Sequence, residues 1–81
     1  MSMTYYVALP FVHGDDGIAP AEAQECHGEA AAIRRAEVMA HTPPNIGALA
    51  FRRSGDPNLG QFGEATVIRC FGEVPERLDE L

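Results

Sequence analysis

A cysteine and a histidine stand side by side, Cys26-His27, just before an alanine-rich run with the composition of a helix. Thiols near a helix amino terminus ionise more readily, and a thiolate is the nucleophile of cysteine enzymes and redox sensors. Adjacent residues, however, rarely direct their side chains at each other in a strand or at a helix start. We therefore expect Cys26 to be buried as a small hydrophobic residue, and a reactive Cys26 assisted by His27 is the alternative.

Two arginines, Arg52 and Arg69, fall on one face of two apolar runs that predict paired strands. Two guanidinium groups on one sheet face could hold a carboxylate or a phosphate. Pairing of each arginine with a surface acid, such as Glu64 or an acid across a dimer, is the simpler interpretation. A protein partner or a small anionic ligand would meet the predicted contact residues Arg52, Arg69, Val67 and Phe71.

Side chains that bind zinc are scattered along the chain, but none has the spacing of a zinc finger, a ribbon or a two-histidine helix site. They are His13, Asp15, Asp16, Cys26, His27, His41 and Cys70. We therefore expect no metal and no cofactor, and no catalytic constellation is identified.

Length and charge narrow the classes of function. The 81 residues leave room for one small domain, and the net charge of −6 with arginine as the sole basic residue type disfavours a phosphate backbone as partner. No apolar stretch reaches the roughly 20 residues of a membrane span, and no secretory signal is recognised. We expect a cytoplasmic protein that binds neither nucleic acid nor membrane, with Cys26 and Cys70 as reduced, buried thiols.

The first half of the chain predicts a strand followed by a helix. Apolar residues alternate over residues 4–12, which indicates a strand, and Pro10 places that strand at an edge or ends it there. Residues 13–17 predict a turn. Residues 18–26 are ambiguous between strand, helix and loop, and we expect them to be extended or irregular, with the helix starting near Gly28.

High helix propensity from residue 29 to residue 42, with an acid in the first turn, predicts a helix that stops at Pro43-Pro44. At 100° per residue, one apolar stripe faces the sheet. It consists of Ala30, Ile33, Ala36, Met39 and Ala40. Arg34, Arg35 and Val38 point away from it.

The strongest pattern is a hairpin, in which the runs 47–53 and 64–71 flank a turn-rich stretch. Pairing Leu49 with Ile68 and Phe51 with Thr66 collects large apolar groups, with Cys70, on one face. The opposite face then carries Ile46, Ala48, Ala50, Val67 and Phe71. One helix covers one face only, so we expect the other to meet a second subunit in a homodimer, through that face or an edge.

These elements predict an α+β fold, with one helix packed on one face of a three- or four-stranded, mainly antiparallel sheet. Residues 1–72 form the domain and residues 73–81 an acidic tail. The expected function is a small homodimeric binding or protein-interaction module without catalytic activity. A small cysteine-dependent enzyme or redox sensor is the alternative.

The chain also resembles a family of short bacterial proteins of unknown function. The similarity covers most of the chain and lies in Glu25-Cys26, residues 32–37, residues 47–51, Gly55-Asp56-Pro57 and residues 71–75. It implies no catalytic residues. A weaker likeness, in residues 5–9 followed by an alanine-rich helix and a hairpin, is to cell-wall-binding domains of the sporulation-related repeat type, which have a second helix and further strands and are usually tethered outside the cytoplasm.

Overall fold

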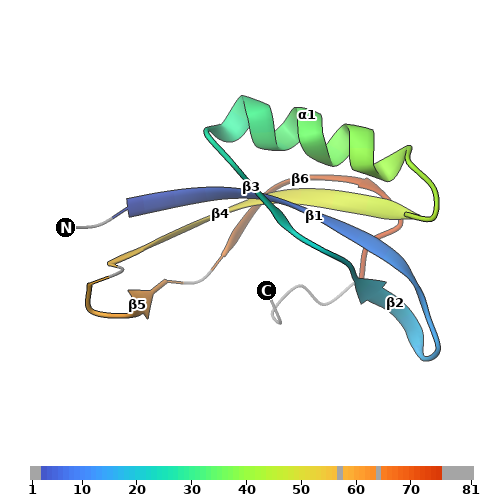
Figure 1. Cartoon of the computed structure of the whole chain (residues 1–81), viewed down its shortest axis with the longest axis horizontal. Coiled ribbons are helices and arrows are strands. Elements are labelled where there is room, and N and C mark those ends of the chain that lie inside the picture. Colours follow the sequence, from blue (N-terminus) through green and yellow to red (C-terminus); the bar gives the residue numbers. More distant parts are fainter. Residues whose placement is uncertain (1–2, 57, 64, 76–81) are drawn as a thin grey trace.

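The computed structural model describes residues 3–56, 58–63 and 65–75. These residues form one helix and six strands of a single antiparallel sheet (Figure 1). The elements in chain order are β1 (Met3–Gly14), β2 (Gly17–Pro20), β3 (Gln24–Cys26), α1 (Glu29–Ala40), β4 (Gly47–Asp56), β5 (Gln61–Phe62) and β6 (Thr66–Gly72). The predicted α+β class, with a helix on one face of the sheet, is confirmed.

The sheet is built around two long central strands, β1 and β4. They pair antiparallel from Met3 opposite Gly55 to Phe11 opposite Gly47. The short strands β2 and β3 share the outer side of β1, and β5 and β6 share the outer side of β4. The described strands exceed the three or four expected because each outer position of the sheet is divided between two short strands.

Pro10 lies inside the central strand β1, opposite Ala48, so its predicted place at an edge or a strand end is wrong. The carbonyl of Pro10 accepts a hydrogen bond of 2.9 Å from the Ala21 N–H, on the side of β1 that faces β2 and β3. Ala21 belongs to the segment that separates those two strands. The proline nitrogen therefore faces a break in the neighbouring ladder, where a missing donor is tolerated.

The connections before the helix follow the sequence-based expectations. Asp15 and Asp16 form the turn between β1 and β2. Of the ambiguous residues, 18–20 belong to β2 and 24–26 to β3, and residues 21–23 connect these strands. The helix α1 begins at Glu29 after the capping residue Gly28. At its other end, the Thr42 hydroxyl donates to the Val38 carbonyl at 2.6 Å.

The buried stripe of α1 differs from the predicted one at a single position. Ala32 and Ala36 are buried, whereas Ala30 is exposed. Ile33, Met39 and Ala40 pack against the same cluster as expected. The exposed side chains include Val38, Arg34 and Arg35.

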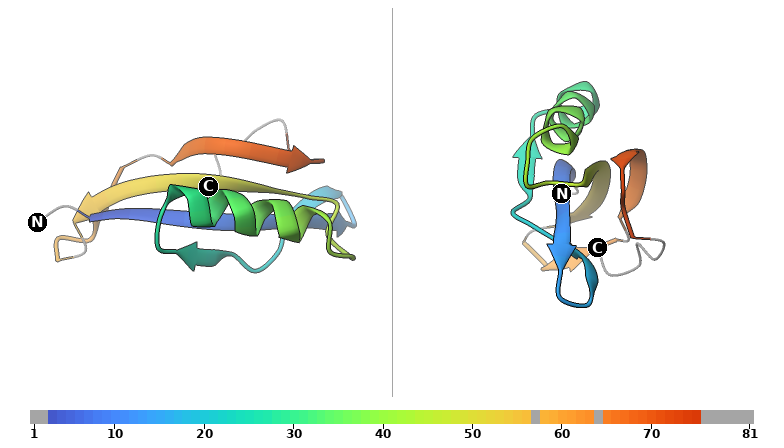
Figure 2. Two further views of the ribbon diagram at one scale, coloured as in Figure 1. Left: turned by 90° about the horizontal axis from the view of Figure 1, so that it is seen from above. Right: turned by 90° about the vertical axis from the view of Figure 1, so that its right-hand side faces the viewer.

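Two apolar layers lie on opposite faces of the sheet. The alanine layer, on the helix side, joins Ala32 and Ala36 to Ala8, Ala48 and Ala50. The second layer, the Leu/Phe layer, consists of Leu9, Phe11, Leu49 and Phe51, with Val7, Ala65 and Val74 packed against it. Both views in Figure 2 place α1 on one side of the sheet only.

The helix therefore covers the face that we expected to be open. Small side chains on both surfaces allow a close approach of helix and strands, which maximises contact along the backbone. The large side chains of Leu49 and Phe51 instead pack among themselves on the opposite face.

The predicted register between β4 and β6 is wrong by two residues at one end. Leu49 lies opposite Cys70 and Phe51 opposite Val67, with a β-bulge near Ala50 and Phe51. The bulge places Ile68 against the alanine layer, where Phe71 also packs. Val67, which we expected beside Phe71, belongs to the other face because it pairs with Phe51.

Beyond β6 the described chain continues to residue 75. The Glu73 N–H donates to the Ile46 carbonyl at 3.0 Å, and Val74 packs against the Leu/Phe layer. Residues 76–81 of the expected acidic tail lie outside the described residues.

Candidate functional site

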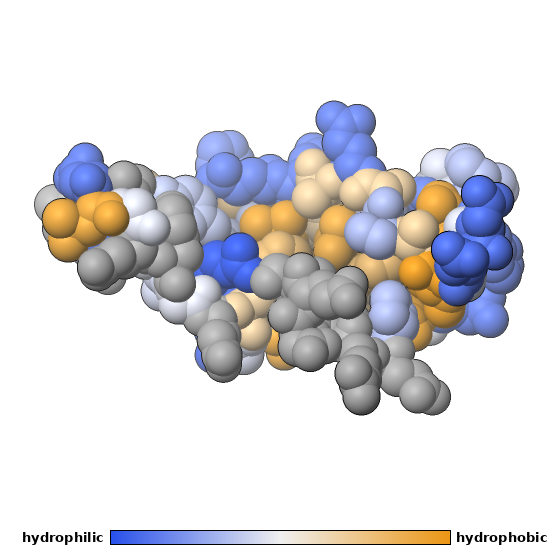
Figure 3. Space-filling view, turned by 90° about the horizontal axis from the view of Figure 1, so that it is seen from below, coloured by the Kyte–Doolittle hydropathy of each residue, from blue (hydrophilic) through white to orange (hydrophobic). Residues whose placement is uncertain are grey.

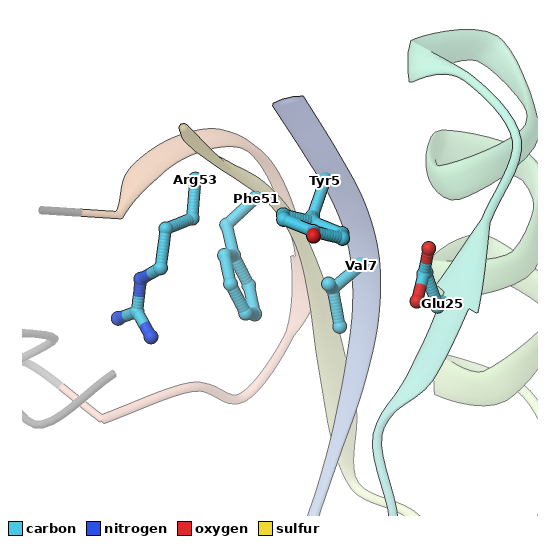
Figure 4. A pocket seen from close by; sticks show the side chains of 5 residues that line it. All are labelled: Tyr5, Val7, Glu25, Phe51 and Arg53. Carbon is cyan, nitrogen blue, oxygen red and sulfur yellow. The ribbon is translucent and has the colours of Figure 1, made fainter. Parts of the chain in front are cut away.

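A groove of about 410 Å³ lies on the sheet face opposite α1. Its lining side chains come from the three adjacent strands β3, β1 and β4 (Figure 4). They are Tyr5, Val7, Glu25, Phe51 and Arg53. We refer to these five residues as the groove.

Strand pairing brings the groove residues together. Val7 lies between two partners, opposite Glu25 on β3 and opposite Phe51 on β4. Tyr5 lies opposite Arg53, two residues further along the same face. Because side chains alternate between the faces of a sheet, this register directs all five to the side away from the helix.

The apolar part of the groove continues the Leu/Phe layer. Phe51 is only 8% exposed, and Leu9 and Leu49 are buried next to it in the same layer. Toward the amino end of β1, Met3 is 48% exposed, and the Tyr5 hydroxyl donates to its sulfur at 3.7 Å. Figure 3 shows apolar side chains along the middle of this side of the molecule.

Opposite charges stand at the two sides of the groove. The Arg53 guanidinium carbon lies 5.9 Å from the centre of the Phe51 ring, within the range of a cation–π contact. Glu25 is exposed and stands across β1 from Arg53, as Figure 4 shows. The groove therefore offers apolar contact in the middle, a cation on one side and a carboxylate on the other.

The two arginines expected to form an anion clamp each have a contact within the chain. Arg52 Nη1 lies 3.7 Å from Glu29 Oε1, so the helix supplies its partner; the alternative partner Glu64 lies outside the described residues. The guanidinium carbon of Arg69 lies 5.7 Å from the centre of the Phe71 ring. Both side chains lie on one face of the sheet, as expected, but α1 covers that face, so its expected place opposite the helix is wrong.

Cys26 is half-buried and packs against the alanine layer, and its thiol donates to the Gln24 carbonyl at 3.7 Å. The neighbouring His27 is exposed. Both residues line a shallow hollow of about 230 Å³ together with Arg35 and others. The structure thus directs the thiol largely toward the core and leaves the imidazole in solvent.

Cys70 is exposed, so its expected burial is wrong. It lies on the outer strand β6, opposite Leu49 and on the face opposite α1. Neither cysteine forms a disulfide.

Among the residues that the structure describes, no three His, Cys, Asp or Glu side chains gather where they could hold a metal ion. Within the same residues, the helix is too short and too polar to cross a membrane.

Sequence reasoning missed the groove, although part of the signal was present. The alternation that predicts the first strand already placed Tyr5 and Val7 on one face, and Phe51 was expected beside Leu49. The pairing of β1 with β3 and β4 is what adds Glu25 and Arg53, and the periodicity of a single segment carries no information on pairing.

Comparisons with protein families, with curated proteins and with solved structures each return no match for the chain. The resemblance to short bacterial proteins of unknown function stays a prediction.

Proposed function

We propose that this chain is a small, non-catalytic interaction module of the cytoplasm, and that it binds another molecule through the groove. The observation that carries the proposal is the combination of Tyr5, Val7 and Phe51 with two opposite charges on the sheet face opposite α1. Free thiols at Cys26 and Cys70 suit a reducing compartment.

The groove has the composition of a binding site. Burial of apolar surface contributes roughly 25 cal/mol per Å², and aromatic side chains supply large contact area with little loss of conformational freedom. Arg53 can meet an anionic group, and Glu25 can meet a cation or a hydrogen-bond donor. The apolar middle thus supports affinity, and the charges orient the partner.

A naphthalene sulfonate dye, 8-anilinonaphthalene-1-sulfonate, tests this surface because it joins an apolar ring system to an anion. We expect it to shift the amide resonances of Tyr5, Val7 and Phe51 in ¹H–¹⁵N spectra of dilute protein. Arg53→Gln should weaken binding about threefold or more, since one charge pair is lost. The matched control Arg52→Gln, on the other face, should leave it unchanged.

The proposal is wrong if the dye shifts resonances around Val38 instead, which is 56% exposed on the outer side of α1. Near-ultraviolet circular dichroism of each variant distinguishes a folded protein from a loosened one, because such dyes also bind molten globules.

Cysteine-dependent chemistry is the second candidate function. It is favoured by one observation, that Cys26 and His27 line the same hollow beside Arg35. This chemistry is the weaker proposal, because the Cys26 thiol is half-buried and donates a hydrogen bond to the Gln24 carbonyl.

A further inference from the structure

The groove is complementary to itself, and we propose that its partner is a second copy of the same chain. This inference rests on the proposed function, because it names the molecule that the groove binds. The observation behind it is that Arg53 and Glu25 lie on either side of the other three groove residues. We call these residues, Tyr5, Val7 and Phe51, the apolar strip.

The strand register sets the separation of the two charges. Arg53 on β4 is level with Tyr5, and Glu25 on β3 is level with Val7, while β1 runs between them. Strand spacing of about 4.8 Å and a rise of about 3.4 Å per residue place the two Cα atoms roughly 12 Å apart. The midpoint between them falls on β1, between Tyr5 and Val7.

A two-fold axis through this midpoint, lying in the plane of the interface and perpendicular to the line from Arg53 to Glu25, brings the two grooves face to face. Rotation about it places Arg53 over Glu25 of the second copy, and Glu25 over Arg53 of the second copy. The same rotation brings Phe51 over Val7 of the second copy. Each contact therefore occurs twice, as an isologous interface requires.

The charge balance of the chain favours this arrangement over contact through another face. A chain with a net charge of −6 repels its own copy, and a cation set directly against an anion offsets part of that repulsion. The groove does so at two places per dimer. Apolar side chains between the charges exclude water and strengthen both pairs.

The apolar surface of this face reaches beyond the five groove residues. Met3, exposed beside Tyr5, extends the apolar strip toward the end of β1. Two sheets packed face to face lie about 10 Å apart, a separation that the Tyr5 side chains of the two copies can bridge.

Charge exchange tests the proposal. Glu25→Arg makes both groove charges positive, and Arg53→Glu makes both negative, so each variant alone should dimerise about tenfold more weakly than the wild type. A mixture of the two variants should form a heterodimer, because each introduced charge then meets its opposite. The double variant Glu25→Arg/Arg53→Glu should dimerise like the wild type.

Sedimentation equilibrium from about 1 μM to 1 mM measures these affinities, with circular dichroism as the check on folding. Arg52→Glu makes the same charge change on the helix side and should leave the dimer constant within about twofold. If Arg53→Glu does not fold, Arg53→Gln takes its place, and its mixture with Glu25→Arg should still associate more tightly than Glu25→Arg alone.

A wild type that stays monomeric throughout this range, or mixed variants that do not recover association, would overturn the proposal. The dye experiment separates this failure from that of the proposed function. If the protein is a monomer and the dye still shifts Tyr5, Val7 and Phe51, the groove binds a partner other than its own copy. If neither occurs, both proposals fail.

Discussion

Ala36 on α1 and Ala50 on β4 belong to one buried cluster between helix and sheet, and neither has any exposed surface. A larger side chain at either position has to push the helix away from the sheet or adopt a strained rotamer. We expect Ala36→Leu to lower the free energy of unfolding by about 1–3 kcal/mol. Urea denaturation measures the change.

The control for this substitution is Ala30→Leu, which adds the same side chain to an exposed position of the same helix. Its effect should stay within about 0.5 kcal/mol. Equal losses for both variants would mean that α1 does not pack through Ala36.

The end of β6 depends on Gly72. Its φ of 69° is unfavourable for other residues, and a Cβ added there would lie 2.6 Å from the Ile46 carbonyl oxygen. Gly72→Ala should therefore cost more than the roughly 1–2 kcal/mol of left-handed strain. Thermal and urea unfolding of the variant report the loss.

Gly60 separates the two causes. It has a similar φ of 66°, but a Cβ added there would meet no atom within 4 Å. Gly60→Ala should thus show the strain alone, and the difference between the two variants measures the clash with Ile46. A smaller loss for Gly72→Ala than for Gly60→Ala would contradict the pairing of β4 with β6 near Gly47.

Local periodicity predicted the elements of this fold well. The alternation over residues 4–12, the alanine-rich run from residue 29 and the two late apolar runs each became the expected strand or helix. Each of these signals arises from residues close in sequence. The predicted buried stripe of α1 included Ala30 instead of Ala32. Both residues are alanines of equal hydropathy, so the sequence does not show which of them faces the sheet.

Pairing between strands was predicted less well, because it depends on contacts far apart in the chain. The bulge near Ala50 and Phe51 leaves no mark in composition, and it changes which face Val67 and Ile68 join. The break between β2 and β3 that tolerates Pro10 is equally invisible until both strands are placed on β1. Glu25 and Arg53 could not be linked for the same reason.

The two thiols should differ in reactivity. Cys70 is exposed and Cys26 is half-buried, so a chromogenic disulfide should modify Cys70 first in the folded protein at neutral pH. Cys70→Ser should abolish the fast phase, and Cys26→Ser should leave it intact. A fast phase that disappears with Cys26→Ser, and that slows in His27→Gln, would instead support the cysteine-dependent alternative.

The ion pair between Arg52 and Glu29 should contribute little to stability. The atoms lie 3.7 Å apart, and the two side chains are 48% and 55% exposed, so water and salt screen the attraction. Glu29 also lies in the first turn of α1, where the helix dipole stabilises an acid by about 0.3–1 kcal/mol. Glu29→Gln therefore removes two effects, whereas Arg52→Gln removes only the pair.

A double-mutant cycle with Arg52→Gln and Glu29→Gln isolates the pair from the dipole. We expect a coupling free energy of at most about 0.5 kcal/mol, which falls further as salt is raised. A coupling above about 1 kcal/mol would show that Arg52 is held firmly against the helix. A weak coupling would let the Arg52 side chain exchange Glu29 for another anion at low energetic cost. The helix side of the sheet would then keep a mobile cation, whereas Arg53 in the groove lies against the Phe51 ring.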